Sequence, residues 1–302
     1  DDVLNDSVMT ANINSVTSLD VSNDSISDLT GIEDFIALES LNCSYNQLTS
    51  LTLSSVAPMT GYLLCTANQL TSLDVSNYPD LNHLNVEQNL LTALDVSSNT
   101  ALTNLNCYYN QLDSLDVSSN TALTNLHCGY NQLTSLDVSS NTALTYLRCD
   151  ANQLTSLDIS NNTALTGLEC YGNSLTTLDV SNNTTLTHLK CQSNQLTSLD
   201  VSNNTALIDL RCFDNQLTTL NMRNGVTDAL TTFNATNNPD LTCIETIDLD
   251  YATENWTNDG GNIDEGVIFS FICGSEDQDV WHVATTGSDG GAGTQESPFA
   301  TI

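Results

Sequence analysis

Hydrophobic and polar residues alternate along most of this chain in a pattern that repeats every 21 residues. Two consecutive copies read LTNLNCYYNQLDSLDVSSNTA (residues 102–122) and LTNLHCGYNQLTSLDVSSNTA (residues 123–143). The L-x-C segment near the start of each copy alternates with period two, which predicts a short strand with Leu and Cys pointing inward. The later segment SLDVS also alternates and predicts a second extended segment on the opposite face.

The repeat predicts a solenoid, because each copy can bury its hydrophobic side only against its neighbours. Eleven copies cover roughly residues 16–240. They begin at Val16, Leu38, Thr60, Leu81, Leu102, Leu123, Leu144, Leu165, Leu186, Leu207 and Leu230. We therefore predict a mostly β fold of about eleven turns, with a parallel sheet on one face and short extended segments on the other.

An Asn at the ninth position accompanies the strand in ten of the eleven copies, for example Asn110, Asn131 and Asn152. Asp24 replaces it in the first copy. An Asn side chain both donates and accepts hydrogen bonds, so we expect it to turn the chain and satisfy buried backbone groups of the neighbouring turn.

Eight of the ten cysteines share the inward sixth position: Cys43, Cys65, Cys107, Cys128, Cys149, Cys170, Cys191 and Cys212. Val21, Val86 and Ala235 fill this position in the other copies, so it accepts a small hydrophobic side chain. Thiols in a straight row cannot surround a zinc ion, and Cβ atoms about 4.8 Å apart are too distant for good disulfide geometry. We expect eight buried free thiols and no metal site.

The remaining cysteines, Cys243 and Cys273, lie beyond the last copy. We predict a disulfide between them that seals the open end of the solenoid, where the last turn lacks a neighbour. Such a disulfide implies an oxidising, extracellular compartment.

The composition narrows the possible partners. The 302 residues contain 4 Lys and Arg against 37 Asp and Glu, for a net charge of −33. Nucleic acid is excluded as a partner, because its binding needs clustered Lys and Arg. No apolar run approaches the roughly 18 residues of a membrane span, so we expect no membrane insertion. Because the chain starts at Asp1 and shows no signal peptide, we expect a processed or trimmed piece of a larger protein.

The outward positions of the predicted strand carry most of the Tyr, His, Lys and Arg residues, whereas the rest of each copy is nearly uniform Asn, Thr, Ser and Asp. Tyr and Arg are enriched in binding hot spots, and aromatic rings offer large contact area at low entropic cost. We predict a ligand-binding strand face formed by Tyr108, Tyr109, His127, Tyr130, Tyr146, Arg148, Glu169, Tyr171, His188, Lys190, Arg211 and Phe213.

A solvated sheet without a ligand is the alternative. The fifth position on four consecutive copies holds Arg148, Glu169, Lys190 and Arg211, which also fits a cross-strand ion ladder centred on Glu169. No metal site is expected on this face, because His127 and His188 are three turns apart, roughly 14 Å. No Ser is distinguished by its position as a nucleophile, so we predict no catalytic residue and no enzyme.

The fifteenth position forms a second column: Asp74, Asp95, Asp116, Asp137, Asp158, Asp179 and Asp200. Carboxylates about 4.8 Å apart repel each other by about 1 kcal/mol even in water. Either local Ser and Thr hydroxyls hold them or calcium ions bind there, and the sequence leaves both open. We expect crowding to raise their pKa values, so that salt or calcium raises the melting temperature.

The 21-residue pattern is identified as a leucine-rich repeat. VTSLDVSNDSISDLTGIEDF resembles an internalin-type first repeat, and NNPDLTCI, NWTNDGGNID and FSFICGSE resemble the C-terminal cap of secreted bacterial leucine-rich-repeat proteins. The resemblance implies a partial N-terminal cap at residues 1–15, the solenoid at 16–240 and a C-terminal cap at 241–279. The tail VWHVATTGSDGGAGTQESPFATI (residues 280–302) resembles the start of a right-handed parallel β-helix domain.

These observations predict a non-enzymatic recognition module on a secreted or cell-surface protein. It would bind an extracellular glycan or protein through the strand face, as a monomer and without a cofactor other than calcium. The alternative is a structural spacer that presents a downstream, polysaccharide-active β-helix domain.

Overall fold

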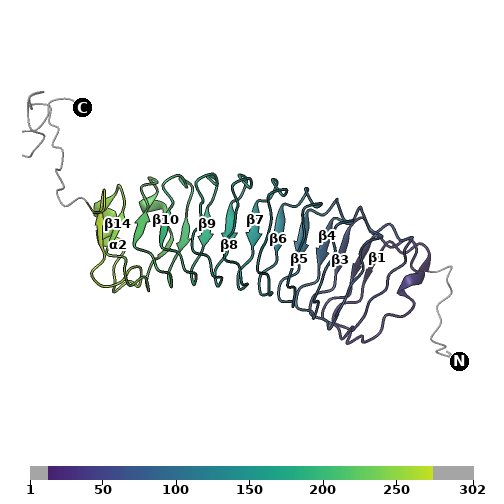
Figure 1. Ribbon diagram of the computed structural model, residues 1–302. Coiled ribbons are helices and arrows are strands. Elements are labelled where there is room, and N and C mark those ends of the chain that lie inside the picture. Colours follow the sequence, from purple (N-terminus) through teal and green to yellow (C-terminus); the bar gives the residue numbers. More distant parts are fainter. Residues whose placement is uncertain (1–12, 275–302) are drawn as a thin grey trace, which may run out of the picture.

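A computed structural model describes residues 13–274, which form an elongated row of stacked coils (Figure 1). One parallel sheet of eleven strands runs along it, with one strand for each predicted copy. Equal positions pair across neighbouring strands, for example Leu126 with Leu147. The strands are β1 (Ser18–Asp20), β2 (Ser40–Asn42), β3 (Tyr62–Leu64), β4 (His83–Asn85), β5 (Asn104–Asn106), β6 (Asn125–His127), β7 (Tyr146–Arg148), β8 (Gly167–Glu169), β9 (His188–Lys190), β11 (Asp209–Arg211) and β13 (Thr232–Asn234).

The second extended segment pairs as a sheet only towards the C-terminal end. There β10 (Ser198–Asp200), β12 (Thr219–Asn221), β14 (Cys243–Glu245) and β15 (Ile268–Ser270) form a parallel four-stranded sheet. In earlier turns the backbone of this segment is hydrogen-bonded by side chains instead. For example, Asn120 Nδ2 donates to the Val96 carbonyl at 2.9 Å. The solenoid has about 12 turns, more than the eleven predicted, because the non-repeating cap continues the stacking.

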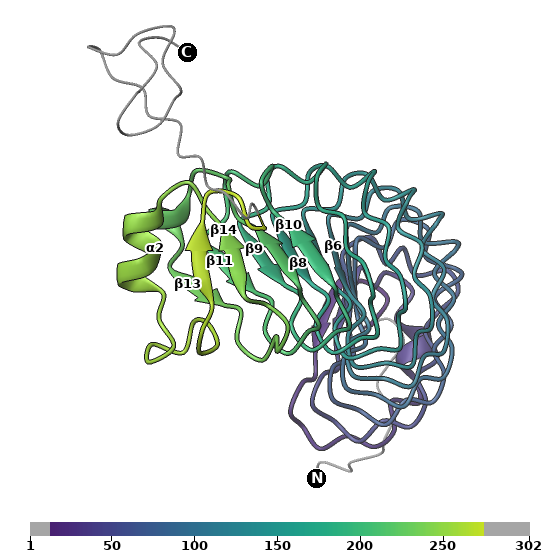
Figure 2. The same ribbon diagram turned by 60° about the vertical axis from the view of Figure 1, so that its left-hand side comes forward.

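Helices are few and short in the described chain. The 3₁₀ helices η1 (Ile32–Asp34) and η2 (Thr227–Ala229) lie in loops, and α2 (Leu249–Asn255) covers the C-terminal end (Figure 2). None of the helices in residues 13–274 has the length and apolar character needed to cross a membrane.

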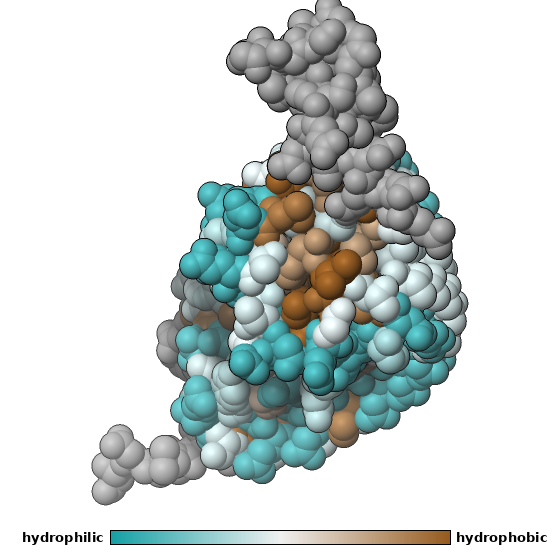
Figure 3. Space-filling view, turned by 90° about the vertical axis from the view of Figure 1, so that its left-hand side faces the viewer, coloured by the Kyte–Doolittle hydropathy of each residue, from teal (hydrophilic) through white to brown (hydrophobic). Residues whose placement is uncertain are grey.

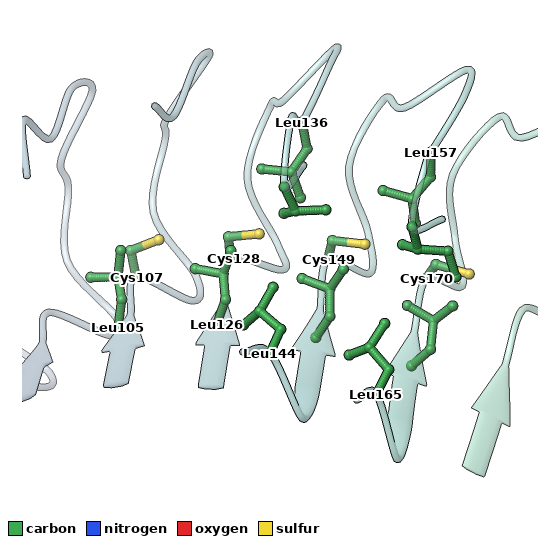
Figure 4. Close-up of a cluster of buried hydrophobic side chains, with 14 of the residues drawn as sticks. Leu105, Cys107, Leu126, Cys128, Leu136, Leu144, Cys149, Leu157, Leu165 and Cys170 are labelled. Atoms are coloured by element: carbon green, nitrogen blue, oxygen red, sulfur yellow. The ribbon is translucent and has the colours of Figure 1, made fainter. Parts of the chain in front are cut away.

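Leucine and cysteine fill the interior of the coils. Leu126, the inward residue of β6, is fully buried, and so is Cys128, which follows the strand. Figure 4 shows Cys107, Cys128, Cys149 and Cys170 in one row beside the inward leucines. All eight cysteines of the ladder are buried and free, as predicted. Burial raises the pKa of the Cys128 thiol well above its usual value, which makes the thiol unreactive.

The Asn at the ninth position joins neighbouring turns as expected. Asn131 Nδ2 donates to the carbonyls of Cys107 and Cys128, and its Oδ1 accepts from the Leu112 backbone N–H at 2.9 Å. A second buried Asn column, which we did not predict, supports the opposite side. In it Asn141 Nδ2 donates to the carbonyls of Val117 and Asn120.

The C-terminal end is closed by a cap. Cys243 and Cys273 form the predicted disulfide, with Cα atoms 5.9 Å apart. The buried Trp256 packs on Phe233 with ring centroids 4.4 Å apart. An apolar patch remains exposed on this end face (Figure 3), where Ile268 and Phe271 are 61% and 53% exposed. The predicted β-helix start at 280–302, and most of the predicted N-terminal cap at 1–15, lie outside the described residues.

We expect the cysteine ladder to be silent in a thiol titration of the native protein, because all eight sulfurs are buried. Denaturation without reductant should expose eight thiols, while the Cys243–Cys273 disulfide stays closed. A count near zero in denaturant would mean that the ladder cysteines pair with one another.

Candidate functional site

The outer surface of the eleven-stranded sheet is formed by the strand residues that alternate with the buried core residues. On β7, Tyr146 and Arg148 are partly exposed on either side of the buried Leu147. The seventh and eighth positions follow each strand directly and extend the same surface. We call this surface the strand face.

Three tyrosines form an aromatic cluster where β5 and β6 end. Tyr109 and Tyr130 stack with centroids 5.6 Å apart and an interplanar angle of 22°. Tyr108 is tilted against Tyr130 at 5.1 Å. Tyr109 and Tyr130 are 55% and 42% exposed, so the two rings are offered to solvent rather than buried.

The eighth position imposes a backbone conformation that suits glycine. Tyr109 and Tyr130 have φ angles of 58° and 50°, and Gly172 has 66° at the same position of a later turn. Bulky residues rarely adopt this left-handed region, and it costs on the order of 1–3 kcal/mol. Two adjacent turns therefore carry large, exposed rings at a position where glycine fits the backbone best and where other turns carry Ala or Ser.

Arg148 joins this aromatic cluster to the next turns. Its guanidinium lies 4.1 Å from the centroid of the Tyr108 ring, and Nη2 donates to the Tyr108 hydroxyl at 2.8 Å and the Tyr171 hydroxyl at 3.3 Å. Its Nε donates at 2.8 Å to Asp150, whose side chain is completely buried. The guanidinium is thus held from several sides.

Glu169 is the centre of an ion ladder across three turns. It accepts hydrogen bonds from Lys190 Nζ at 2.7 Å and from the Tyr146 hydroxyl at 2.6 Å, and its Oε2 lies 3.5 Å from Arg148 Nε. Burial raises the pKa of Glu169, but the hydrogen bonds from Lys190 and Tyr146 outweigh burial and lower it. The cross-strand ladder considered from the sequence is therefore present from Arg148 to Lys190, whereas Arg211 pairs with Asp209 of its own strand instead.

Two glycines make room for this network. A Cβ at Gly167 would lie 2.5 Å from the Tyr146 ring, and a Cβ at Gly129 would lie 2.5 Å from Asp150 Oδ1. Both glycines stand at outward positions that carry larger residues in other turns. Glycine thus replaces a larger residue in the two places where a side chain would clash with Asp150 or Tyr146.

Nine of the twelve predicted residues form one connected group. His127 belongs to it through its ring, 5.4 Å from that of Tyr146, and burial, followed by the nearby Arg148, lowers the pKa of His127. The other three lie towards the C-terminal end: His188 Nδ1 is 2.9 Å from the Thr187 hydroxyl, Arg211 binds Asp209 and Phe213 is half-buried.

Two carboxylates of the strand face escaped the sequence analysis. Asp150 and Asp209 neutralise Arg148 and Arg211, at 2.8 and 3.0 Å. Both occupy outward positions of the repeat, so the alternation of inward and outward residues would have placed them on this face.

The Asp column on the opposite segment behaves differently from our expectation. The Ser118 backbone N–H donates to Asp116 at 2.9 Å, and the same bond recurs along the column, as at Asp137. The Ser118 side chain and backbone lower the pKa of Asp116, so the predicted increase is wrong. Local hydrogen bonds outweigh the repulsion because the carboxylates are exposed to screening water. Calcium binding by this column stays a prediction.

This correction reverses the expected pH dependence. A carboxyl whose folded pKa is lowered contributes stability that is fully present above the unfolded pKa of 3.8 and is lost as the pH falls through the folded pKa. We expect the melting temperature to fall on acidification below 3.8, and to fall less in the Asp116→Asn/Asp137→Asn variant. A melting temperature that rises on protonation would show that repulsion dominates.

Comparison with known proteins identifies the architecture. No family model matches the sequence, and no curated protein matches it either. Among solved structures, the functional domain of InlJ from Listeria monocytogenes, which includes a cysteine ladder, is 37% identical with a TM-score of 0.67. The match covers 78% of this chain and 60% of that chain. The fold is a leucine-rich-repeat solenoid.

Other leucine-rich-repeat structures show the same fold at lower identity. The internalin InlF from Listeria monocytogenes is 22% identical with a TM-score of 0.52, and the match covers 88% of this chain and 89% of that chain. The plant peptide hormone receptor RGFR1, in complex with RGF2, is 20% identical with a TM-score of 0.61, covering 73% and 42%. The structural neighbours thus include internalin-type leucine-rich-repeat proteins.

Proposed function

We propose that this leucine-rich-repeat solenoid is a non-enzymatic recognition module that binds an extracellular protein or glycan through the strand face. The observation that carries the proposal is the pair Tyr109 and Tyr130. Both rings are exposed and both hold a left-handed backbone that disfavours them. The repeat imposes this backbone on the eighth position of other turns too, as at Ala151 and Ser193, so what distinguishes these two adjacent turns is the large exposed ring that each carries there.

The surroundings of the pair support a preformed site. Arg148 fixes the ring and hydroxyl of Tyr108, which in turn packs on Tyr130. A surface whose side chains are already ordered loses little entropy on binding. RGFR1, which shares the fold, is seen with a bound peptide hormone, and this favours a polypeptide partner. The Cys243–Cys273 disulfide favours an extracellular, secreted or cell-surface location.

Replacement of Tyr109 and Tyr130 by Ser tests the proposal. We expect the double variant to fold normally and to lose at least ~10-fold in affinity, because exposed rings contribute to contact area rather than to the core. Binding would be measured against panels of immobilised extracellular proteins and oligosaccharides.

Asp116→Asn/Asp137→Asn is the matched control, because these residues lie on the opposite segment. It should leave binding nearly unchanged. Loss of binding in the Asp variant alone would place the site on that segment. A strand face that binds nothing in either panel would favour the structural spacer.

The spacer has one observation in its favour. The ladder of Arg148, Glu169 and Lys190 satisfies its own charges and needs no ligand to be stable. A spacer of this kind would hold a downstream domain at a fixed distance, and replacement of the exposed tyrosines would leave its role intact.

A further inference from the structure

We propose that the partner of the strand face is a cationic polypeptide surface, whose Lys or Arg side chains stack on Tyr109 and Tyr130 and pair with Glu87. The proposal rests on the recognition function argued above and specifies the chemistry of its partner. Three independent features of the chain support it.

The first feature is that every Lys and Arg of the chain is already neutralised. Only four exist, and each forms an ion pair with a carboxylate. The pairs are Arg148 with Asp150, Lys190 with Glu169, Arg211 with Asp209 and Arg223 with Glu245, at 2.8, 2.7, 3.0 and 3.2 Å. An anionic partner, such as a sulfated or carboxylated glycan, would find no free side-chain cation. These ion pairs therefore argue against an anionic partner.

The second feature is the excess of acidic residues. With 37 Asp and Glu against 4 Lys and Arg, the solenoid carries a net charge of −33. A field of this sign attracts basic partners over long range and accelerates their association, whereas it repels acidic ones. Charge complementarity therefore favours a basic surface.

The third feature is the local chemistry beside the tyrosines. Cations bind well over the faces of Tyr rings, and the chain already forms this contact internally, with Arg148 over Tyr108 at 4.1 Å. Tyr109 and Tyr130 offer similar rings to solvent. A second guanidinium or ammonium, supplied by a partner, would find the same surroundings.

Glu87 supplies a carboxylate at the edge of this cluster. It precedes Gln88, whose backbone N–H donates to the Tyr108 carbonyl at 2.9 Å, and it accepts from Asn106 Nδ2 at 2.9 Å. Within residues 13–274, no Lys, Arg or His pairs with it. The next residue, Asn89, bonds the Tyr109 carbonyl in the same way, so this carboxylate lies one turn away from the exposed Tyr109 ring.

Fluorescence anisotropy with the full chain tests this proposal. The probes are a labelled oligolysine peptide, an oligoglutamate of equal length and a neutral xylan oligosaccharide. We expect binding of oligolysine alone, weakened by salt. Tyr109→Ser/Tyr130→Ser should lower its affinity at least ~10-fold, and Glu87→Gln by roughly 5-fold.

The Asp116→Asn/Asp137→Asn variant distinguishes a specific site from general electrostatic attraction. It removes two negative charges, more than Glu87→Gln or the tyrosine variant, and it leaves the strand face unchanged. It should weaken oligolysine binding less than ~2-fold at physiological salt, where exposed charges are screened. An equal loss in the Asp and Tyr variants would overturn the proposal. Tyrosine-dependent binding of the neutral oligosaccharide instead of oligolysine would also overturn it, while leaving the recognition function intact. If the tyrosine variant changes the binding of no probe, the cationic-partner proposal fails, and the panels of extracellular proteins and oligosaccharides decide the recognition function separately.

Discussion

Replacing Asn131 by Leu is expected to lower the free energy of unfolding by about 4 kcal/mol. The side chain of Asn131 bonds the carbonyls of Cys107, Cys128 and Gly129, and it accepts from the Leu112 N–H. Leu has a similar size but can make none of these bonds. The buried Leu112 N–H loses its partner, which costs about 1–3 kcal/mol. The three carbonyls each lose one of two donors, at about 1 kcal/mol each, because Asn110, Asn152 and the Tyr109 N–H still bond them. Urea unfolding followed by circular dichroism would measure the loss.

The neighbouring residue provides a matched control. Gln132 is exposed, and its backbone N–H bonds the Leu112 carbonyl at 2.8 Å without help from its side chain. Gln132→Leu should therefore change stability by no more than about 0.5 kcal/mol. If the two variants unfolded at the same urea concentration, the Asn column would not be what joins the turns.

The main sheet follows from the repeat, because a period-two segment in a 21-residue copy can bury its apolar side only by stacking. Leu126 and Leu147, and Cys128 between them, lie where that pattern places them. The second sheet was harder to predict. Its last two strands, β14 and β15, belong to the cap, where no repeat fixes which residues come together.

The strand face was predictable in composition but not in contacts. The alternation of inward and outward positions places Tyr108, Arg148 and Tyr171 on one surface. The hydrogen bonds between them, however, depend on side-chain rotamers and lengths. The long guanidinium of Arg148 reaches back across two turns to Tyr108. The backbone conformation of the eighth position is likewise absent from a hydrophobic pattern, so the exposure of Tyr109 and Tyr130 became apparent only in the structure.

Two of the predicted rings, Tyr146 and Tyr171, are half-buried and already engaged. The hydroxyl of Tyr146 is bonded to Glu169 and that of Tyr171 to Arg148. Their replacement would disturb the ion ladder as well as any ligand contact. Tyr109 and Tyr130 are better test positions because their rings project into solvent.

Removal of the Arg148 side chain is expected to lower the free energy of unfolding by about 3–5 kcal/mol. Asp150 is completely buried, and Arg148 is its only ion-pair partner within residues 13–274. Arg148→Ala leaves that carboxylate without a cation in the interior, and Tyr108 and Tyr171 lose their donor. Urea unfolding of Arg148→Ala, Asp150→Asn and the double variant would measure the coupling between the two side chains.

The double variant separates a buried pair from a surface pair. In Arg148→Ala/Asp150→Asn no charge is left unpaired at this position, so we expect it to be more stable than Arg148→Ala alone. Arg211→Ala is the matched control, because the side chain of Arg211 is 40% exposed against 28% for Arg148, and that of Asp209 is 10% exposed against none for Asp150. Its loss should be the smaller one. A cost below about 1 kcal/mol for Arg148→Ala is the value expected of an exposed ion pair. It would mean that the network around Asp150 adds no rigidity to the strand face, and that Tyr108 and its neighbours are ordered by their own packing.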